Sequence, residues 1–358
     1  MLLLGPQLLL GSLALGSLVP GASAAVVTEI PPFLRGDVQI AYTYEQLSGL
    51  LIERGDEDVE VGRRTVSDHM LRYGLVFSVG PGIAVFAEVP HYVSSRVSYG
   101  ALSDMVYDPG TGSGTYVGTT PGTEGTYVDG AGLGGIWFGV RGTPFSEAFP
   151  KRNSATTWLL EGAIRTGDPT SFWTVDDAGK RGAGPGGTAA RLHTAFSTTL
   201  GNTAPYVSGT YIGEGKHTAT VVTPDGVSHG EVEVDPANHG DVRIGIELLA
   251  GRNPASGAQF VFDMHLGVAY DAFGQLPSGF YLPNVLDVSS GGLVQQSEQL
   301  EAGGGIGVHW RPFENMQIGV HGDLGYHMPQ RLEYPYPVYT GGDTVNVTVG
   351  STLGVRFR

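Results

Sequence analysis

The sequence predicts an all-β fold, a closed antiparallel transmembrane β-barrel of about twelve strands. Three observations predict it: apolar and polar residues alternate, the connections are alternately long and short, and helical periodicity is almost absent after residue 24. Alternation with a period of two is typical of a strand whose two faces meet different surroundings. Because hydrocarbon admits only helices or closed barrels, long strands in a chain without helical segments favour the barrel.

Twelve segments alternate in this way and are bounded by Gly, Pro, Asn or Asp, which are common in turns. Most contain 11 to 15 residues, whereas strands of soluble proteins contain about 5–6 and membrane-spanning strands about 9–11. In chain order the predicted strands are 36–45, 67–80, 83–93, 129–143, 155–167, 187–200, 205–213, 240–251, 258–272, 299–312, 316–328 and 343–358.

The connections are sorted by length, so that all long ones fall at one end of the sheet. The long connections are 46–66, 94–128, 168–186, 214–239, 273–298 and 329–342, and the short ones are 81–82, 144–154, 201–204, 252–257 and 313–315. Short periplasmic turns, long extracellular loops and an even number of strands are typical of bacterial outer-membrane barrels. A soluble β-sandwich, the alternative, gives no reason for this sorting.

The strand 258–272 illustrates the two faces. Phe260, Phe262, Met264, Leu266, Val268 and Tyr270 share one face, and Asp263, His265 and Asp271 share the other. The frequent Gly and the mixed charges of the polar face favour a wet interior of limited width over a solvated outer surface. We therefore expect the apolar face to meet lipid and the polar face to line the lumen.

Aromatic side chains are expected in two belts at the membrane interfaces. The candidates near the long loops are Tyr44, Tyr92, Tyr211, Tyr270 and Tyr326, and those near the short turns are Phe145, Tyr206, Trp310 and Phe313.

The first residues read MLLLGPQLLLGSLALGSLVPGASAA, an apolar run followed by small residues. This pattern predicts a signal peptide over 1–24, although no Lys or Arg precedes the apolar run; an N-terminal membrane anchor is the alternative. Residues 25–35 are then a short periplasmic or lumenal segment, and residues 36–358 form the barrel.

The composition excludes several kinds of partner. The net charge of −15 argues against nucleic acid, and the absence of Cys excludes disulfides and thiolate metal sites. We expect no cofactor. The acidic segment 53–64 in the first long loop suggests either divalent ions at a lipopolysaccharide surface or an ordinary solvated loop.

Two pairs of titratable residues are expected on the lumen face near the middle of the sheet. Asp263 and His265 share one strand, and His321 and Asp323 lie two strands away. The strand between them offers Gly303, Gly305 and Gly307, so the pairs should stand roughly 10 Å apart along an unobstructed wall. A metal site, a pH-responsive constriction and an ordinary pore lining remain open for this group.

Further charged residues are expected to line the lumen with mixed signs, which suggests ion-paired walls or a polar conduit. They are Arg72, Glu161, Arg165, Arg191, His193, Asp241, Arg243, Glu247, Glu301, His309, Arg311 and Arg356. Candidate lumen or gating residues are thus distributed over most of the barrel, and none is assigned a catalytic or metal-binding role.

An outer-membrane hydrolase is a weaker alternative. A lipase needs a Ser and a His together on the lipid face, but His193 and Ser197 share the inward parity, and Ser228 with His229 lies in a long loop. Asn238, His239 and Asp241 lie at an extracellular rim, as the acids and His of omptin-type proteases do. We expect no enzymatic activity.

Two short segments carry a family resemblance. The end of the chain, GSTLGVRFR, resembles the terminal strand of outer-membrane barrels, which ends in an aromatic residue that the assembly machinery reads; here Phe357 is penultimate. Arg165-Thr166-Gly167-Asp168-Pro169 resembles a strand end in the family of the MetA-pathway of phenol degradation, itself similar to long-chain fatty-acid transporters. That resemblance implies an uptake barrel for hydrophobic or aromatic small molecules.

Together these observations predict an exported protein of the outer membrane of a Gram-negative bacterium. Its expected partners are outer-membrane lipids, lipopolysaccharide, the barrel assembly machinery and a small-molecule solute. The expected function is passive passage through the lumen; the alternative is a structural or surface-interaction barrel whose lumen its own ion pairs close.

Overall fold

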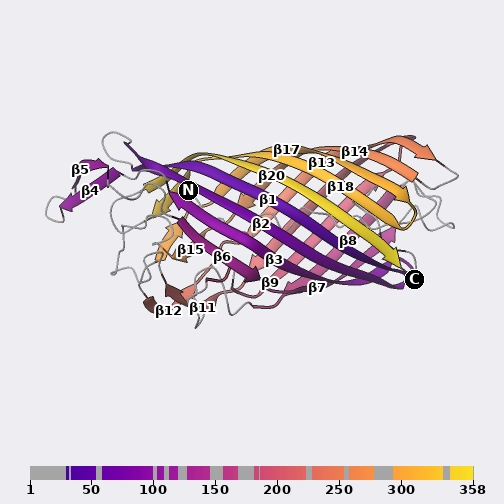
Figure 1. Ribbon diagram of the computed structural model, residues 1–358, viewed down its shortest axis with the longest axis horizontal. Helices are drawn as coiled ribbons and strands as arrows, with labels where there is room; N and C mark the ends of the chain where they lie inside the picture. Colours follow the sequence, from indigo (N-terminus) through magenta and orange to yellow (C-terminus); the bar gives the residue numbers. More distant parts are fainter. Residues whose placement is uncertain are drawn as a thin grey trace.

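The computed structural model is all-β and contains the closed antiparallel barrel that the sequence predicts (Figure 1). The structure describes residues 30–31, 34–53, 59–99, 103–108, 113–119, 127–145, 156–167, 181–184, 186–222, 228–253, 258–277, 293–333 and 339–357. The expected signal peptide, most of the segment 25–35, and Asp168 and Pro169 lie outside these residues. Much of the acidic segment 53–64 does so too.

Twelve strand positions close the barrel within the described residues, each strand pairing antiparallel with its neighbours. Closure is made by β20 on β1, in register from Gly36 opposite Phe357 to Glu53 opposite Tyr339 with one shift. In order around the barrel the strands are β1 (Gly36–Glu53), β2 (Val59–Gly80), β3 (Ile83–Tyr99), β7 (Trp137–Phe145), β8 (Thr156–Arg165), β9 (Ala189–Thr198), β10 (Thr203–Glu214), β13 (His239–Asn253), β14 (Ala258–Asp271), β17 (Gln299–Phe313), β18 (Met316–His327) and β20 (Tyr339–Phe357).

The long connections carry strands that the sequence did not predict. Small hairpins form from β4 (Ser103–Asp108) with β5 (Ser113–Thr119), and from β11 (His217–Val222) with β12 (Ser228–Val234). Three short strands, β15 (Gly274–Pro277), β16 (Leu293–Gln296) and β19 (Gln330–Glu333), extend the sheet beside β20 at the long-loop end. The barrel strands β1, β2 and β20 also run well past their predicted limits into this end.

The predicted strand 129–143 is interrupted. Its first part, β6 (Tyr127–Leu133), pairs with residues 91–98 of β3 near the long loops, and β7 pairs with residues 83–88 near the short turn. Pro90 of β3 lies at the junction and has no N–H to donate across the ladder. The Gly134 N–H donates to the Pro90 carbonyl at 2.9 Å, and β3 carries a bulge between Tyr92 and Ser95.

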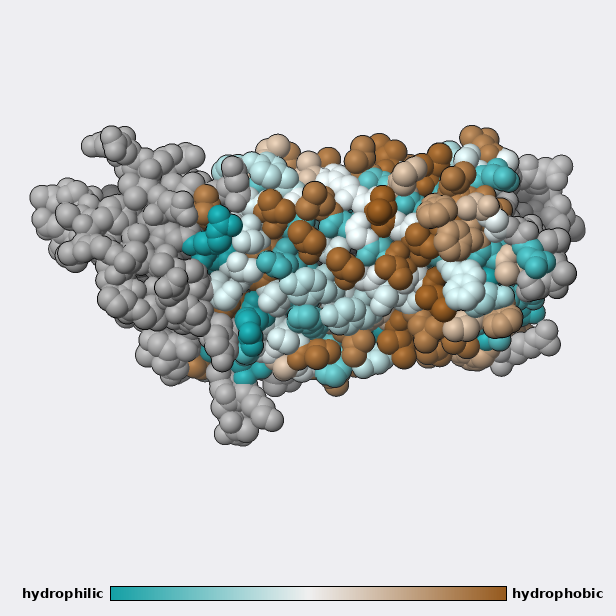
Figure 2. All heavy atoms as spheres, turned by 45° about the horizontal axis from the view of Figure 1, so that its top comes forward, coloured by the Kyte–Doolittle hydropathy of each residue, from teal (hydrophilic) through white to brown (hydrophobic). Residues whose placement is uncertain are grey.

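The outer face carries the apolar band that a membrane requires. Leu266, Ile306 and Ile244 are 73%, 67% and 66% exposed, and Figure 2 shows such hydrophobic side chains over the wall of the barrel. So much exposed apolar surface on a soluble protein would favour aggregation, whereas lipid accepts it. No helix in the described part of the chain is both long and apolar enough to cross a membrane.

The predicted faces are confirmed on β14, where Phe262, Met264, Leu266, Val268 and Tyr270 are all exposed. Phe86 and Glu88 alternate with lipid-facing residues on β3, as Trp137 and Arg141 do on β7, and all four are buried on the inner face.

Two aromatic belt candidates were wrong. Tyr92 is fully buried, and Tyr206 is 6% exposed with its hydroxyl in the lumen. Other candidates have exposed side chains on the outer face, such as Tyr211 and Phe313.

Candidate functional site in the barrel lumen

The lumen contains the charged residues that the sequence assigned to it. Most are buried or half-buried on strands whose opposite parity is exposed to lipid: Arg72, Glu161, Arg165, Arg191, His193, Asp241, Arg243, Glu247, Glu301, His309, Arg311 and Arg356. Their distribution is uneven, and two parts of the wall differ in how their side chains are packed.

A hydrogen-bonded chain of four side chains crosses the wall from β10 to β18. The Tyr206 hydroxyl donates to Asp263 Oδ1 at 2.9 Å, and His265 bonds Asp263 Oδ2 through Nδ1 at 3.0 Å. The other ring nitrogen, Nε2, lies 2.7 Å from Asp323 Oδ1. The pairs expected to stand roughly 10 Å apart therefore touch, because His265 and Asp323 reach toward each other over β17.

Gly305 makes this contact possible. A Cβ at this position would overlap Asp323 Oδ1 and lie 2.8 Å from the Gly322 carbonyl oxygen. The same arrangement recurs nearby, where Glu301 lies over Gly325 and His321 over Gly350. These three inward side chains thus lie against glycines of neighbouring strands, where a larger residue would displace them.

The position of His265 between two carboxylates links the protonation state of its ring to theirs. Both ring nitrogens can donate only in the imidazolium form. Two ionised carboxylates therefore require a charged ring, which gives charge-assisted hydrogen bonds at both ends. The remaining member of the predicted group, His321, does not join this chain, and its ring lies over Gly350 of β20 instead.

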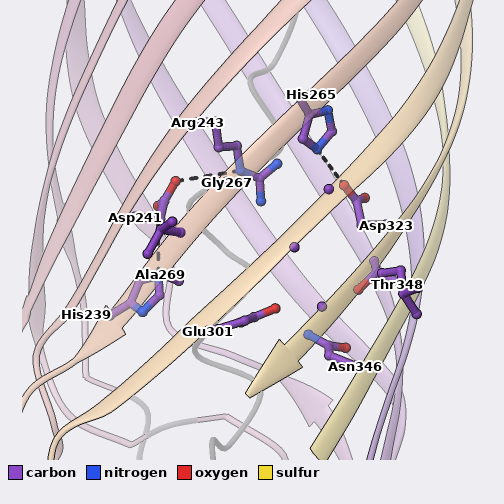
Figure 3. A pocket seen from close by; sticks show the side chains of 15 residues that line it. His239, Asp241, Arg243, His265, Gly267, Ala269, Glu301, Asp323, Asn346 and Thr348 are labelled. Carbon is purple, nitrogen blue, oxygen red and sulfur yellow. Dashed lines mark hydrogen bonds and ion pairs between the residues drawn. The ribbon is translucent and has the colours of Figure 1, made fainter. Parts of the chain in front are cut away.

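A cavity lies along the same wall (Figure 3). Asp241, Arg243 and His265 line it from β13 and β14, and Glu301 and Asp323 face them from β17 and β18. Arg243 Nε lies 3.7 Å from Asp241 Oδ1, and His239 Nδ1 lies 2.9 Å from Asp271 Oδ1. About 60 Å³ is open to water-sized molecules, which is less than the ~150 Å³ of a cavity that takes up benzene.

Part of the wall from β3 to β9 carries a cluster of arginines, glutamates and aromatic rings, here named the guanidinium–aromatic cluster: Phe86, Glu88, Trp137, Arg141, Glu161 and Arg191. Arg191 bonds both Glu88 oxygens at 3.2 and 3.3 Å and lies 2.8 Å from Glu161. Its guanidinium also lies 4.9 Å from the Trp137 ring centre, and that of Arg141 lies 4.6 Å from the Phe86 centre.

The described N-terminal residue Ile30 packs into this side of the barrel. It is 7% exposed and belongs to one apolar cluster with Val76, Ala84 and Phe86. One part of the lumen is therefore filled by packed side chains, whereas on the wall from β13 to β18 glycines reduce the volume of the side chains that point inward. The sequence suggested that residues before the first strand could enter the lumen, but it did not identify the contact.

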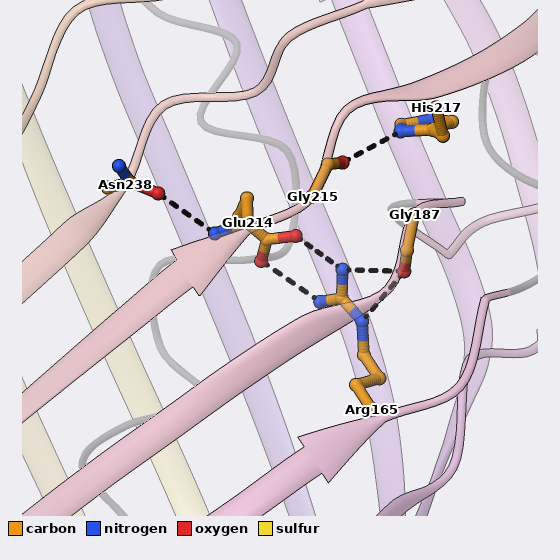
Figure 4. Close-up of polar contacts among 6 residues, drawn as sticks. All are labelled: Arg165, Gly187, Glu214, Gly215, His217 and Asn238. Atoms are coloured by element: carbon orange, nitrogen blue, oxygen red, sulfur yellow. Dashed lines mark hydrogen bonds and ion pairs between the residues drawn. The ribbon is translucent and has the colours of Figure 1, made fainter.

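A third group, at the long-loop end, ties strand ends together (Figure 4). Arg165 at the end of β8 donates to Glu214 on β10 at 3.1 and 2.5 Å and to the Gly187 carbonyl at 3.0 and 3.3 Å. The Asn238 side chain accepts a hydrogen bond from the Glu214 N–H at 2.9 Å. Glu214 was not among the predicted residues, although its inward parity on β10 could have indicated it.

His217 lies beside this group on β11, outside the membrane-spanning strands. Burial lowers the pKa of His217 below its ordinary value, and the positive charge of Arg165 acts in the same direction. The hydrogen bond from Nδ1 to the Gly215 carbonyl, at 3.4 Å, opposes these effects.

The structure favours neither a metal centre nor the hydrolase constellations. Among the described residues, no three His, Asp or Glu side chains converge as metal ligands would. His193 bonds the Thr210 hydroxyl at 3.0 Å, and Ser197, four residues along the same strand, is about 13 Å away by strand rise. Asn238 and His239 bond Glu214 and Asp271.

No protein-family model and no curated protein sequence matches the chain. Among solved structures, an outer membrane channel from Pseudomonas putida F1 matches with a TM-score of 0.52 and 12% identity, covering 92% of this chain and 98% of that one. A Pseudomonas aeruginosa FadL homologue matches at 0.40 and 11%, covering 91% and 90%. A mutant of the TodX monoaromatic hydrocarbon channel matches at 0.42 and 8%, covering 93% and 92%.

The first of these likenesses establishes the fold, which is that of an outer-membrane β-barrel. It spans nearly the whole of both chains, so the strand order and the closure are shared, whereas at 12% identity the lumen side chains need not be. The TM-scores of the other two structures are too low to support a shared fold.

Proposed function

We propose that this protein is an outer-membrane channel through which small molecules pass passively. The observation that carries the proposal is the glycine-lined wall from β13 to β18, which keeps inward side chains flat and encloses a water-accessible cavity. A barrel meant only to be rigid has no need for glycines there, since Gly in a strand loses packing and costs conformational entropy. The fold shared with an outer membrane channel supports the same proposal.

The exported location and the lipid partners are part of this proposal. The exposed apolar band suits the lipids of an outer membrane, and Phe357 near the chain end suits recognition by the barrel assembly machinery. Hydrophobic or aromatic molecules are the proposed solutes, as the resemblance of Arg165-Thr166-Gly167-Asp168-Pro169 to the family of the MetA-pathway of phenol degradation implies. Such a solute is larger than the described cavity, so its passage requires side chains to move.

Planar-bilayer recording and liposome swelling test the proposal. Refolded protein should give stable current steps in KCl and should admit small neutral solutes into vesicles. A fully folded barrel that carries neither current nor solute would contradict it. Heat-modifiable mobility on a gel shows independently that the barrel has folded.

The structural barrel is the second candidate, and one observation favours it. The guanidinium–aromatic cluster and Ile30 fill part of the lumen with packed, ion-paired side chains. If that packing extended across the barrel, no current would flow. The bilayer recording therefore separates the two candidates, and protease and lipase assays on the same refolded sample, with and without Ca²⁺, address the hydrolase alternative.

A further inference from the structure

Arg72 is a buried cation with two N–H donors for which no described residue is an acceptor. It lies on the lumen face of β2 and is 2% exposed. Within the described residues neither its Nε nor its Nη2 has a hydrogen-bond partner. A buried guanidinium left in this state is costly, because it gives up its hydration without gaining protein acceptors. Such a group calls for an acceptor that is not part of the chain described.

The nearest carboxylate is already engaged. Glu88 lies close enough to Arg72 for their charges to interact, but both of its oxygens accept hydrogen bonds from Arg191. In this region Arg72, Arg141 and Arg191 bring three positive charges against the two negative charges of Glu88 and Glu161. One positive charge is therefore left over, and Arg72 is the arginine that carries it.

A second donor lies on another strand, close enough to Arg72 for an electrostatic interaction. His321 on β18 lies with its ring over Gly350 of β20, on the side toward β1 and β2, and it interacts electrostatically with Arg72. Its other charged neighbours are Arg243, His265 and Asp323, and the one acid among them is bonded to His265. Arg72 and His321 thus bring N–H groups to one part of the lumen wall.

The free edge of Arg72 is the edge that binds carboxylates elsewhere in this protein. Arg96 holds Asp129 through Nε and Nη2 at 2.7 and 3.0 Å, and Arg356 holds Asp37 through the same two nitrogens at 2.9 and 3.4 Å. This side-on pair of N–H groups matches the spacing of two carboxylate oxygens. A planar carboxylate therefore satisfies both orphan donors of Arg72 at once, which a spherical anion does not.

We propose that Arg72, with His321 opposite, forms a subsite in the lumen for the carboxylate group of a small monocarboxylate solute. This inference rests on the proposed channel function and names a solute class for it. The solute gives up water as it enters, exchanges it for the guanidinium edge, and leaves toward the glycine-lined wall. Passage requires that the solute also leave, so the affinity should be weak, with a Kd on the order of a millimolar.

The test measures binding and current on the same variants. Sodium benzoate is titrated into refolded full-length barrel in detergent and followed by ligand-observed NMR, with benzamide as the neutral isostere and with acetate, chloride and phosphate as competitors. Arg72→Met removes the charge at similar length, and Arg72→Lys keeps the charge but removes the fork. Arg96→Met removes an arginine from an exposed ion pair and is the matched control.

The expected result is saturable binding of benzoate but not of benzamide, weakened at least tenfold by Arg72→Met, partly by Arg72→Lys and not by Arg96→Met. Acetate should compete, and chloride and phosphate should compete much less. Equal binding to wild type and Arg72→Met, or no binding to wild type, would overturn the subsite. Competition by chloride as strong as by acetate would overturn its assignment to carboxylates.

Failure of the subsite is distinguishable from failure of the channel. If the barrel carries current in KCl and Arg72→Met binds benzoate as well as the wild type does, the channel proposal stands and the subsite proposal fails. If a folded barrel binds benzoate through Arg72 but carries no current, the ligand site stands and the channel proposal fails. Heat-modifiable mobility confirms that each variant has folded, and Arg72→Met should fold readily because it leaves no hydrogen-bond acceptor of the described residues unpaired.

Discussion

Gly305→Ala should break the bridge between His265 and Asp323. The new methyl group would overlap Asp323 Oδ1 and approach the Gly322 carbonyl oxygen to 2.8 Å. The carbonyl belongs to the backbone and cannot give way, so the carboxylate must leave its position 2.7 Å from His265 Nε2. A hydrogen bond between charged groups contributes about 1.5–3 kcal/mol, so we expect the free energy of unfolding to fall by about 2 kcal/mol.

Gly307→Ala is the matched control on the same strand and face. Its Cβ would meet the Asp263 and His321 Cβ atoms at 3.5 and 3.6 Å, which are ordinary contacts. The variant should change the free energy of unfolding by less than about 0.5 kcal/mol.

Urea unfolding of the barrels in lipid vesicles, followed by Trp fluorescence, measures both variants, and Asp323→Asn completes a double-mutant cycle with Gly305→Ala. In the cycle the two changes should be strongly non-additive, because each removes the same bridge. Equal losses for Gly305→Ala and Gly307→Ala, or additive losses in the cycle, would refute the role assigned to the glycine.

Three further outcomes are expected. Arg191→Met should lower the free energy of unfolding by about 3–5 kcal/mol in urea titrations, because it removes the donor that bonds both buried Glu88 oxygens and leaves Glu161 with its bridge to Arg141. Arg96→Met at an exposed pair should cost less than about 1 kcal/mol, and similar losses would contradict the buried network. Arg165→Lys should raise the rate at which added protease cleaves the long-loop end, because Lys cannot hold Glu214 and the Gly187 carbonyl together; an unchanged cleavage rate counts against that role. His217 should titrate below the ordinary His range by NMR. The stability it contributes is therefore present above the unfolded pKa and is lost as pH falls through the lower folded pKa, and His217→Gln should remove this part of the pH dependence.

The period-two pattern predicted the barrel well because lipid outside and water inside impose opposite demands on alternate residues. Phe262 and Asp263 could be assigned to opposite faces from their spacing alone. The sorting of connections by length gave the direction of the strands. The outward extension of β1, β2 and β20, and the hairpins in the loops, were not predicted. In the extensions of β1 and β2 some inward positions, such as Leu47 and Val66, are apolar and buried, so polar and apolar residues no longer mark the two faces.

Inside the lumen, parity identified which residues face inward but not which of them touch. The bridge from His265 to Asp323 depends on two side chains lying down over Gly305, and strand spacing alone placed them too far apart. Tyr206 and Tyr92 were misplaced because an aromatic residue near a strand end suits both a membrane interface and a lumen lined by hydrogen-bond acceptors. The break between β6 and β7 follows from Pro90 on the neighbouring strand, and nothing within 127–145 signals it.

The proposed channel function requires that ions and small solutes pass along the glycine-lined side of the lumen. Single-channel recording of the refolded barrel in a planar bilayer tests it most directly. We expect discrete, stable current steps in KCl that Ala269→Phe, on the cavity wall, sharply reduces without loss of heat-modifiable folding. A correctly folded wild-type barrel without current, or steps that Ala269→Phe leaves unchanged, would contradict this claim.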